Sequence, residues 1–289
     1  MKNYFDLKGQ TAIVTGCSTG LGVQMAEALA SQGCNIVAVA RRQNLIDEVA
    51  AKIKSEYGVE TLAIQCDITD TESVDAMVQA AYDKFGRIDI LINNAGTGAV
   101  APAVEITDEQ FYNELNIDLF GSFRVARAVA KIAMIPAGYG RIINIASMYG
   151  LVGNKAATCA PYHAAKGGVI NMTRALAAEW ANQGITVNSI CPGYFWTPLT
   201  AETLDSEYFQ AYMKSAVPIE RYGKEGELDT WTLFLASPAS TYVTGQNIAV
   251  DGGYTAILSR IGLLLIHKGL SAVLLRQSLY LCRPSDPEA

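Results

Sequence analysis

A glycine-rich turn near the start of the chain joins a short apolar strand to a helix. Thr11–Thr15 is an apolar, β-branched run, and Gly16, Gly20 and Gly22 follow it before a helical pattern of apolar residues that reaches Ala30. Glycines let the backbone turn tightly and let a diphosphate approach, while the helix presents free N–H groups and the positive end of its dipole. A plain strand-to-helix turn is the alternative. Because an alternating chain begins here, we interpret the turn as a nucleotide-binding loop.

Strand-like and helical segments continue to alternate along the chain. Further strands are predicted at 34–40, 61–68, 88–92 and 141–146, and a helix is predicted from about residue 71 to residue 85. The alternation predicts an α/β fold with a Rossmann-like, doubly wound and mainly parallel sheet, helices on both faces, and a single domain.

The residues after the second strand favour one of two nicotinamide cofactors. In such folds this position lies near the adenosine ribose, where an acidic residue would accept hydrogen bonds from a 2′-hydroxyl and repel a 2′-phosphate. Here Ala40 is followed by Arg41 and Arg42. Two guanidiniums favour a 2′-phosphate, so we expect NADP(H) rather than NAD(H). An ordinary basic helix start is the alternative.

Polar residues also follow the third and fourth strands. Asp67 can accept a hydrogen bond from an adenine amino group, or it can cap the next helix. Asn93, Asn94 and Gly96 stand at the carboxyl end of the strand at 88–92, where a backbone must come close to a ligand.

Tyr162 and Lys166 are four residues apart in a segment with apolar residues at helical spacing. On a helix that spacing places the phenol one turn from the ammonium on the same face. A phenol titrates near ~10 in isolation, and a fixed cation beside it lowers the pKa towards the working range. The pair can also be a solvated surface pair. With the upstream features, it indicates a proton-transfer group.

Composition excludes several other classes of protein. The net charge of -6 and a pI near 5.1, without a cluster of basic residues, argue against a nucleic-acid partner. Six cysteines are scattered singly and the chain has two histidines, so no metal site is expected and free thiols in a reducing compartment are the simplest account. The N-terminus lacks an apolar signal core, which predicts a cytoplasmic protein.

Several motifs together resemble those of the short-chain dehydrogenase/reductase family over about residues 5 to 255. The residues that carry the resemblance are Thr15–Gly22, Asn93–Gly96, Ser147 after the strand at 141–146, Tyr162 with Lys166, Pro192–Gly193 with Thr197, and Thr244–Gly253. Within the family the chain is most similar to gluconate 5-dehydrogenases and to the 3-oxoacyl carrier-protein reductase group. Some bacterial hydroxysteroid dehydrogenases look alike at this level.

The resemblance implies the roles of the site residues. Ser147 would bind the substrate oxygen, Tyr162 would pass the proton, and Lys166 would lower the pKa of the phenol while binding the nicotinamide ribose. The cofactor would contact Gly16, Ser18, Thr19, Gly20, Leu21, Gly22, Arg41, Arg42, Asp67, Ile68, Asn94, Ala95, Gly96, Tyr162, Lys166, Pro192, Gly193, Phe195 and Thr197.

One position departs from the family pattern. The family has an asparagine that holds a water for proton relay where Asp118 stands in this chain. We assign the relay to Asp118, and Asn116 is the competing candidate.

Two segments are expected to border the substrate. The connection at 148–159 is longer than usual, which either adds specificity or only lengthens a surface loop, and Tyr149 lies in it. Tyr194 and Trp196 belong to a run of three aromatics that opens a stretch resembling the family's mobile lid. Tyr149, Tyr194 and Trp196 are the substrate candidates. Tyr208, Phe209 and Tyr212 are interpreted as lid packing.

The resemblance predicts an NADP(H)-dependent oxidoreductase that interconverts a ketone and a secondary alcohol, with a keto-gluconate or related sugar acid as first choice. Reduction of a 3-oxoacyl carrier-protein or of a hydroxysteroid is the alternative, and a non-catalytic nucleotide-binding regulator is a third. A homotetramer is expected, built through two long helices at about 109–133 and 161–183.

The family pattern stops near residue 255, and an apolar extension follows. Arg260, Lys268 and Arg276 interrupt it too often for a span of ~20 apolar residues, so no membrane is expected. A membrane-surface helix ranks below an added packing or subunit-contact element or a segment not original to the gene. We therefore divide the chain into a domain at 1–255 and a C-terminal extension of unknown role at 256–289.

Overall fold

The computed structural model describes residues 3–98, 100–154, 158–198 and 200–257. The chain divides into two units, Met1–Thr255 and Ala256–Ala289. The predictions made for the extension fall almost wholly outside the described residues. The sheet and the predicted site both belong to the first unit.

In the described residues, seven strands form one sheet in the order β3-β2-β1-β4-β5-β6-β7, and every neighbouring pair is parallel. The predicted Rossmann-like, doubly wound fold is confirmed. Short apolar runs were sufficient to predict it because strands covered on both faces read as nearly continuous hydrophobic sequence. The strands are β1 (Thr11–Thr15), β2 (Asn35–Ala40), β3 (Thr61–Gln65), β4 (Ile90–Asn93), β5 (Gly140–Ile145), β6 (Ile185–Pro192) and β7 (Asn247–Val250).

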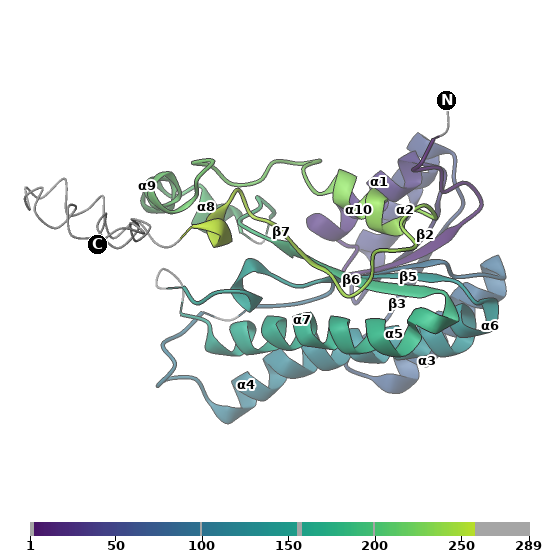
Figure 1. Cartoon of the computed structure of the whole chain (residues 1–289), viewed down its shortest axis with the longest axis horizontal. Coiled ribbons are helices and arrows are strands. Elements are labelled where there is room, and N and C mark those ends of the chain that lie inside the picture. The colour runs from purple at the N-terminus through teal and green to yellow at the C-terminus, as the bar shows by residue number, and fades with distance from the viewer. Residues whose placement is uncertain (1–2, 99, 155–157, 199, 258–289) are drawn as a thin grey trace, which may run out of the picture. The chain divides into compact units, whose positions relative to one another are not determined.

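Helices cover both faces of the sheet (Figure 1). One layer contains α1 (Leu21–Ser31), α2 (Gln43–Tyr57) and α10 (Asp229–Ala236). The other contains α3 (Thr71–Phe85), α5 (Ser122–Val129) and α7 (Ala160–Trp180), with α4 (Asp108–Leu115) leading into it. The shorter helices are α6 (Ile135–Ala137), α8 (Ala201–Leu204) and α9 (Glu207–Ala216), and the 3-10 turns are η3 (Met148–Gly150), η4 (Ala181–Gln183) and η5 (Tyr254–Ala256).

The long helix expected at about 109–133 contains two π-helical stretches. These are η1 (Asn116–Gly121), between α4 and α5, and η2 (Ala130–Met134), between α5 and α6. Because a π-turn adds a residue to the turn, it shifts the side chains that follow relative to an ideal helix, and such turns are frequent at functional sites. Asp118 lies within the first of them and is fully buried.

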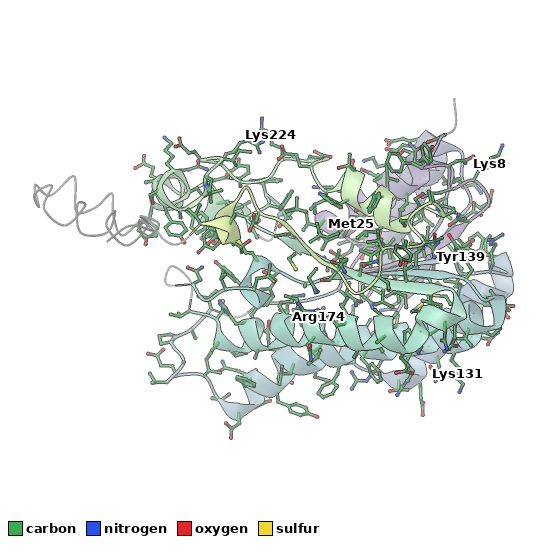
Figure 2. The ribbon with its side chains drawn as sticks, viewed as in Figure 1. Lys8, Met25, Lys131, Tyr139, Arg174 and Lys224 are labelled. Atoms are coloured by element: carbon green, nitrogen blue, oxygen red, sulfur yellow. The ribbon has the colours of Figure 1, made fainter. Side chains whose placement is uncertain are left out.

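Apolar side chains fill the space between each helical layer and the sheet. Met25 of α1 is completely buried in one cluster, and Val74 of α3 is completely buried in the other. Figure 2 shows Met25 inside the fold, whereas the amines of Lys8, Lys131 and Lys224 lie on its outside. Each large apolar side chain buried in this way contributes about 1.5–3 kcal/mol, so the layers fix the strands that carry the site.

Candidate active site

Four loops of the predicted site leave the carboxyl ends of adjacent strands. The glycine turn follows β1, Asn94–Gly96 follows β4, Ser147 follows β5, and Gly193 follows β6. The strand order reverses beside β1, which lies between β2 and β4. Ligands of open α/β sheets bind in the crevice at such a reversal, so the parallel topology brings these loops together.

The glycine turn is shaped so tightly that side chains do not fit. Gly16 and Gly20 have φ angles of 66° and 65°, a region that side chains rarely adopt. A Cβ on Gly22 would lie 2.5 Å from the carbonyl oxygen of Gly16. Because Gly20 is the N-cap residue of α1, no capping side chain covers the first N–H groups of that helix. These features fit the diphosphate of a dinucleotide.

Asn94 holds the glycine turn to the end of β4. Its Nδ2 donates to the carbonyl oxygens of Thr15 (3.1 Å) and Gly16 (3.3 Å). In return, the hydroxyl oxygen of Thr15 accepts hydrogen bonds from the backbone N–H groups of Asn94 (3.0 Å) and Ala95 (3.1 Å). Asn94 therefore positions the cradle through its side chain. Thr15 was missed as a site residue because a β-branched residue in a buried strand carries no functional signal of its own.

The basic residues after β2 lie beside the glycine turn. Arg41 and Arg42 are exposed, and Nη2 of Arg42 donates to the hydroxyl of Ser18 at 2.9 Å. Asp67 closes a turn by accepting from the N–H (2.9 Å) and the hydroxyl (2.8 Å) of Thr69. The Thr69 N–H lowers the pKa of the Asp67 carboxyl, and Arg41 adds to that effect.

The two alternatives for Asp67 were a bond to the adenine amino group and capping of the next helix, and the structure shows which residue caps that helix. Asp70, rather than Asp67, caps α3 by accepting from the N–H of Glu72. Ile68 is 7% exposed, and its Cδ1 would lie 2.6 Å from a Cβ on Gly121. Ile68 therefore packs in the core beneath the region predicted to bind adenine.

Tyr162 and Lys166 lie one turn apart on α7, and the ammonium is 5.4 Å from the centroid of the phenol ring. Lys166 is 4% exposed and donates to the carbonyl oxygen of Ile145 at 3.1 Å. Its Nζ also lies 3.1 Å from Oδ2 of Asp118. Ser147 is 7% exposed at the end of β5. The structure thus brings Ser147, Tyr162, Lys166 and Asp118 together.

Burial and charge act in opposite directions on Tyr162. Burial raises the pKa of its phenol, Lys166 lowers it, Asp118 raises it, and a hydrogen bond with Ser147 lowers it, so that the pKa is raised overall. For Lys166, burial lowers the pKa, but Tyr162 and Asp118 outweigh burial and raise it. The lysine is therefore a fixed cation at working pH, and the phenol is protonated at neutral pH.

The two relay candidates lie on the same π-turn but have different contacts. Oδ1 of Asp118 accepts from the N–H of Thr97 at 2.8 Å, while its other oxygen faces Lys166. Asn116 instead accepts from Nη2 of Arg124 at 2.9 Å. A Cβ on Gly96 would lie 3.0 Å from Asp118, so the loop after β4 also closes over this carboxylate. Of the two candidates, Asp118 is the one that contacts the lysine.

The segment after β6 closes the other side of the crevice. A Cβ on Gly193 would lie 2.6 Å from Cα of Asp251, which requires glycine there. Phe195 is 6% exposed and forms a bridge with Gly223. Thr197 lies so close to the glycine turn that a Cβ on Gly20 would be 3.2 Å from its side chain. The segment from Pro192 to Thr197 therefore passes next to the glycine turn.

The structure brings two of the three substrate candidates together. The hydroxyls of Tyr149 and Tyr194 are 2.8 Å apart, and the Tyr149 ring meets Tyr162 edge-on at 6.3 Å. Burial raises the pKa of Tyr149 to about 12, so its hydroxyl is neutral. Trp196 is 43% exposed and donates to Asp205 at 3.0 Å, away from this pair.

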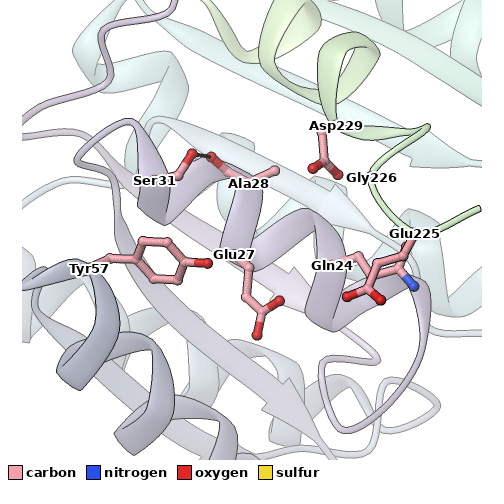
Figure 3. A pocket seen from close by; sticks show the side chains of 8 residues that line it. All are labelled: Gln24, Glu27, Ala28, Ser31, Tyr57, Glu225, Gly226 and Asp229. Atoms are coloured by element: carbon pink, nitrogen blue, oxygen red, sulfur yellow. Dashed lines mark hydrogen bonds between the residues drawn. The ribbon is translucent and has the colours of Figure 1, made fainter.

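Two pockets lie outside the glycine cradle. One of about 340 Å³ adjoins the start of α7 and is lined by Ala103, Gly153, Asn154, Thr158, Cys159, Ala160 and His163. A second of about 250 Å³ lies between α1, the end of α2 and the segment before α10 (Figure 3). Its lining is acidic and includes no residue that the sequence assigns to chemistry: Gln24, Glu27, Ala28, Ser31, Tyr57, Glu225, Gly226 and Asp229. The first pocket adjoins α7, the helix that carries Tyr162.

The fold and the residues brought together at its edge are typical of a nicotinamide-dependent oxidoreductase, and known proteins share the fold. Residues 16–255 match the family described as enoyl-(acyl carrier protein) reductase. Galactitol 2-dehydrogenase (L-tagatose-forming) from Cereibacter sphaeroides is 35% identical over 255 residues, 88% of this chain and 98% of the relative. The 3-oxoacyl-[acyl-carrier-protein] reductase from Synechocystis is 39% identical over 249 residues, 86% of this chain and 97% of the relative.

A solved structure extends the likeness to three dimensions. Gluconate 5-dehydrogenase from Burkholderia cenocepacia, in complex with NADP and tartrate, is 36% identical and has a TM-score of 0.84, covering 88% of this chain and 98% of its own. The chain belongs to the short-chain dehydrogenase/reductase family, and it is an oxidoreductase that acts on CH–OH groups. Within the described residues, no helix is long and apolar enough to cross a membrane.

Proposed function

We propose that this chain is an NADP(H)-dependent reductase and dehydrogenase that interconverts a ketone and a secondary alcohol on a keto-gluconate or related sugar acid. The observation that carries the proposal is the Tyr162–Lys166 pair, with the ammonium 5.4 Å from the phenol ring, at the same sheet edge as Ser147 and the glycine cradle.

The chain's own residues have separate tasks in the reaction. Ser147 donates to the substrate oxygen, and Tyr162 donates the proton that this oxygen takes up during ketone reduction. Lys166 stabilises the phenolate that remains, so charge moves between groups that are already in place. Asp118 holds Lys166 at 3.1 Å and anchors the relay. When bound, the nicotinamide supplies or accepts the hydride.

The glycine turn, Asn94–Gly96, and the segment at 192–197 would hold the dinucleotide. A preference for NADP(H) is supported by the exposed Arg41 and by Arg42, whose guanidinium bonds the Ser18 hydroxyl at 2.9 Å. Both can pair with a 2′-phosphate. Gluconate 5-dehydrogenase from Burkholderia cenocepacia, which shares this fold, was solved with NADP.

The substrate choice is supported by the sugar-acid and polyol dehydrogenases among the relatives. Reduction of 3-oxoacyl carrier-protein is the second candidate, because a reductase of that kind is 39% identical. Hydroxysteroid oxidation keeps the same chemistry with an apolar substrate. Assays of 5-ketogluconate, an acetoacetyl thioester and a ketosteroid with NADPH decide among the three. If 5-ketogluconate gives no NADPH oxidation, the sugar-acid assignment is wrong.

The alternative of a non-catalytic nucleotide-binding regulator is opposed by the enzyme class of the family and by the juxtaposed Ser147, Tyr162 and Lys166. We also propose a cytoplasmic homotetramer. The assembly is supported by the partly exposed aromatic residues Phe111 and Phe120 on the α4–η1 stretch, where the family resemblance places a subunit contact. The compartment is supported by the five described cysteines, which are buried and form no disulfide with one another.

A further inference from the structure

The wall of the site beside Tyr162 contains four tyrosines from separate parts of the chain. Tyr149 follows β5, Tyr194 follows β6, Tyr212 lies on α9, and Tyr254 lies in η5. The ring of Tyr194 meets those of Tyr149, Tyr212 and Tyr254 edge-on, at centroid distances of 6.2, 6.3 and 5.8 Å. The hydroxyls of these four tyrosines lie close together.

Asn154 joins these hydroxyls. Its Nδ2 donates to the hydroxyl oxygen of Tyr149, through a short contact, and to that of Tyr194 at 3.3 Å. Its Oδ1 accepts from the hydroxyl of Tyr212 at 3.4 Å. The hydroxyls of Tyr212 and Tyr254 are 3.0 Å apart. One amide thus connects the loop after η3 with α9, the helix of the segment that resembles a lid.

The positions of the hydrogens follow from these partners. The single hydroxyl proton of Tyr212 goes to Asn154 Oδ1, so Tyr254 must donate to Tyr212. Tyr149 and Tyr194 both receive hydrogen bonds from Asn154, and their mutual bond uses only one of their two protons. The other proton is left over from the bonds among Tyr149, Tyr194 and Asn154.

A stacked histidine fixes the Tyr149 ring from its other side. The ring of His163 lies 4.7 Å from that of Tyr149, with an angle of 9° between the planes. Nδ1 of His163 is 2.9 Å from the carbonyl oxygen of Cys159, which can only accept, so this nitrogen carries the hydrogen. His163 and Asn154 both line the pocket of about 340 Å³.

We propose that the Tyr149–Tyr194 hydroxyl pair, oriented by Asn154, recognises an oxygen of a polyhydroxylated substrate and discriminates against acyl chains. This inference rests on the proposed function and specifies its substrate class. Asn154 is a positioning residue in this arrangement. An acyl chain against the wall would bury the remaining hydroxyl proton of the pair without an acceptor, whereas a sugar hydroxyl or carboxylate would accept it. Sites built to bond a substrate hydroxyl discriminate strongly against analogues that lack it.

The test compares two carbonyl substrates in three variants. Asn154→Leu keeps the side-chain volume and removes the amide, Tyr212→Phe removes only the link to α9, and Tyr208→Phe is the matched control because Tyr208 is 74% exposed on the same helix. The substrates are 5-ketogluconate, which carries hydroxyls, and 2,3-butanedione, which carries none. NADPH is the reductant for both.

We expect Asn154→Leu to lower kcat/KM for 5-ketogluconate about 10- to 100-fold and that for butanedione less than about threefold, since hydrogen bonds to the hydroxylated substrate are lost selectively. Tyr212→Phe should lower kcat/KM for 5-ketogluconate about threefold, and Tyr208→Phe should leave kcat/KM for both substrates unchanged. Equal losses on both substrates, or no loss with 5-ketogluconate, overturn the proposal. Tyr212→Phe decides the question if Asn154→Leu does not fold.

A binding measurement separates this inference from the proposed function. If the unaltered enzyme reduces neither carbonyl with NADPH, the proposed function fails. Calorimetric titration of D-gluconate into the NADPH-loaded protein then tests the wall alone. If Asn154→Leu binds D-gluconate at least about tenfold more weakly than the unaltered protein, recognition by the tyrosine pair is supported. Unchanged binding, or no binding to the unaltered protein, refutes it.

Discussion

Replacing Asp118 with asparagine should make alcohol oxidation less dependent on alkaline pH. Oxidation needs the phenolate of Tyr162 to accept the proton, and Asp118 raises the pKa of that phenol. Removing the negative charge lowers the pKa, while Lys166 stays in place through its bond to the Ile145 carbonyl. The rising limb of the oxidation rate against pH therefore moves to lower pH.

The geometry sets the size of this effect. Lys166 Nζ is 3.1 Å from Asp118 and 5.4 Å from the Tyr162 ring centroid, so the carboxylate lies at most about 8.5 Å from that centroid. At a separation of about 8 Å and an effective dielectric constant of about 20, two unit charges repel by about 2 kcal/mol. Below the midpoint of the profile, oxidation should rise about 10- to 30-fold.

The same substitution should destabilise the fold. Asp118 and Lys166 are 0% and 4% exposed, and removing one partner of a buried ion pair costs about 3–5 kcal/mol. The retained bond from Thr97 favours the lower end, so we expect Tm to fall by about 6–10 °C.

The assay is the initial rate of alcohol oxidation with saturating NADP⁺ between pH 6 and pH 10, together with a thermal unfolding scan. Asn116→Ala is the matched control, because Asn116 lies on the same π-turn but contacts Arg124. It should leave the pH profile unchanged. If the rising part of the oxidation profile stays at the same pH or moves to higher pH in Asp118→Asn, the electrostatic effect of Asp118 on Tyr162 is refuted.

Four further substitutions test other parts of the site. Tyr162→Phe should lower kcat by at least about 100-fold, because general acid–base catalysis contributes roughly that much; unchanged turnover would remove the proton-transfer role. Arg41→Ala should raise KM for NADPH about tenfold and leave KM for NADH within about twofold, as should Arg42→Ala, since each loses one charge-assisted contact to a 2′-phosphate. Gly22→Ala places a Cβ 2.5 Å from the Gly16 carbonyl oxygen, so the turn must shift; calorimetry should show NADPH binding weakened at least about tenfold, and unchanged affinity would contradict the cradle.

The sequence predicted the parts of the site that depend on short spacings. Tyr162 and Lys166 are linked by one helical turn, and the glycine turn follows its strand directly, so local periodicity was sufficient for both. The predicted helix at about 71–85 is α3 (Thr71–Phe85) because its apolar face repeats regularly and Gly86 ends it in the left-handed conformation.

Contacts between distant segments could not be read from spacing. Asp118 was assigned from the family pattern rather than from spacing, and it contacts Lys166 from within a π-turn, where the sequence shows an ordinary helical pattern. Asn154 bonds tyrosines that are up to 58 residues away in the sequence (Tyr212), and only the unusual length of its loop pointed to it. Trp196 was grouped with Tyr194, but the chain turns after β6 and places the indole against Asp205.

The carboxylate at position 118 also bears on the direction of the reaction. An amide there would leave Lys166 uncompensated, and the cation would favour the phenolate. Burial raises the pKa of Tyr162 most strongly and the buried carboxylate adds to it against Lys166, so Tyr162 stays protonated at neutral pH, which is the form that donates to a ketone oxygen. Ketone reduction therefore needs no prior ionisation of the phenol, whereas alcohol oxidation does. With both nucleotides saturating, reduction should be the faster direction near pH 7, and oxidation should gain on it as the pH rises.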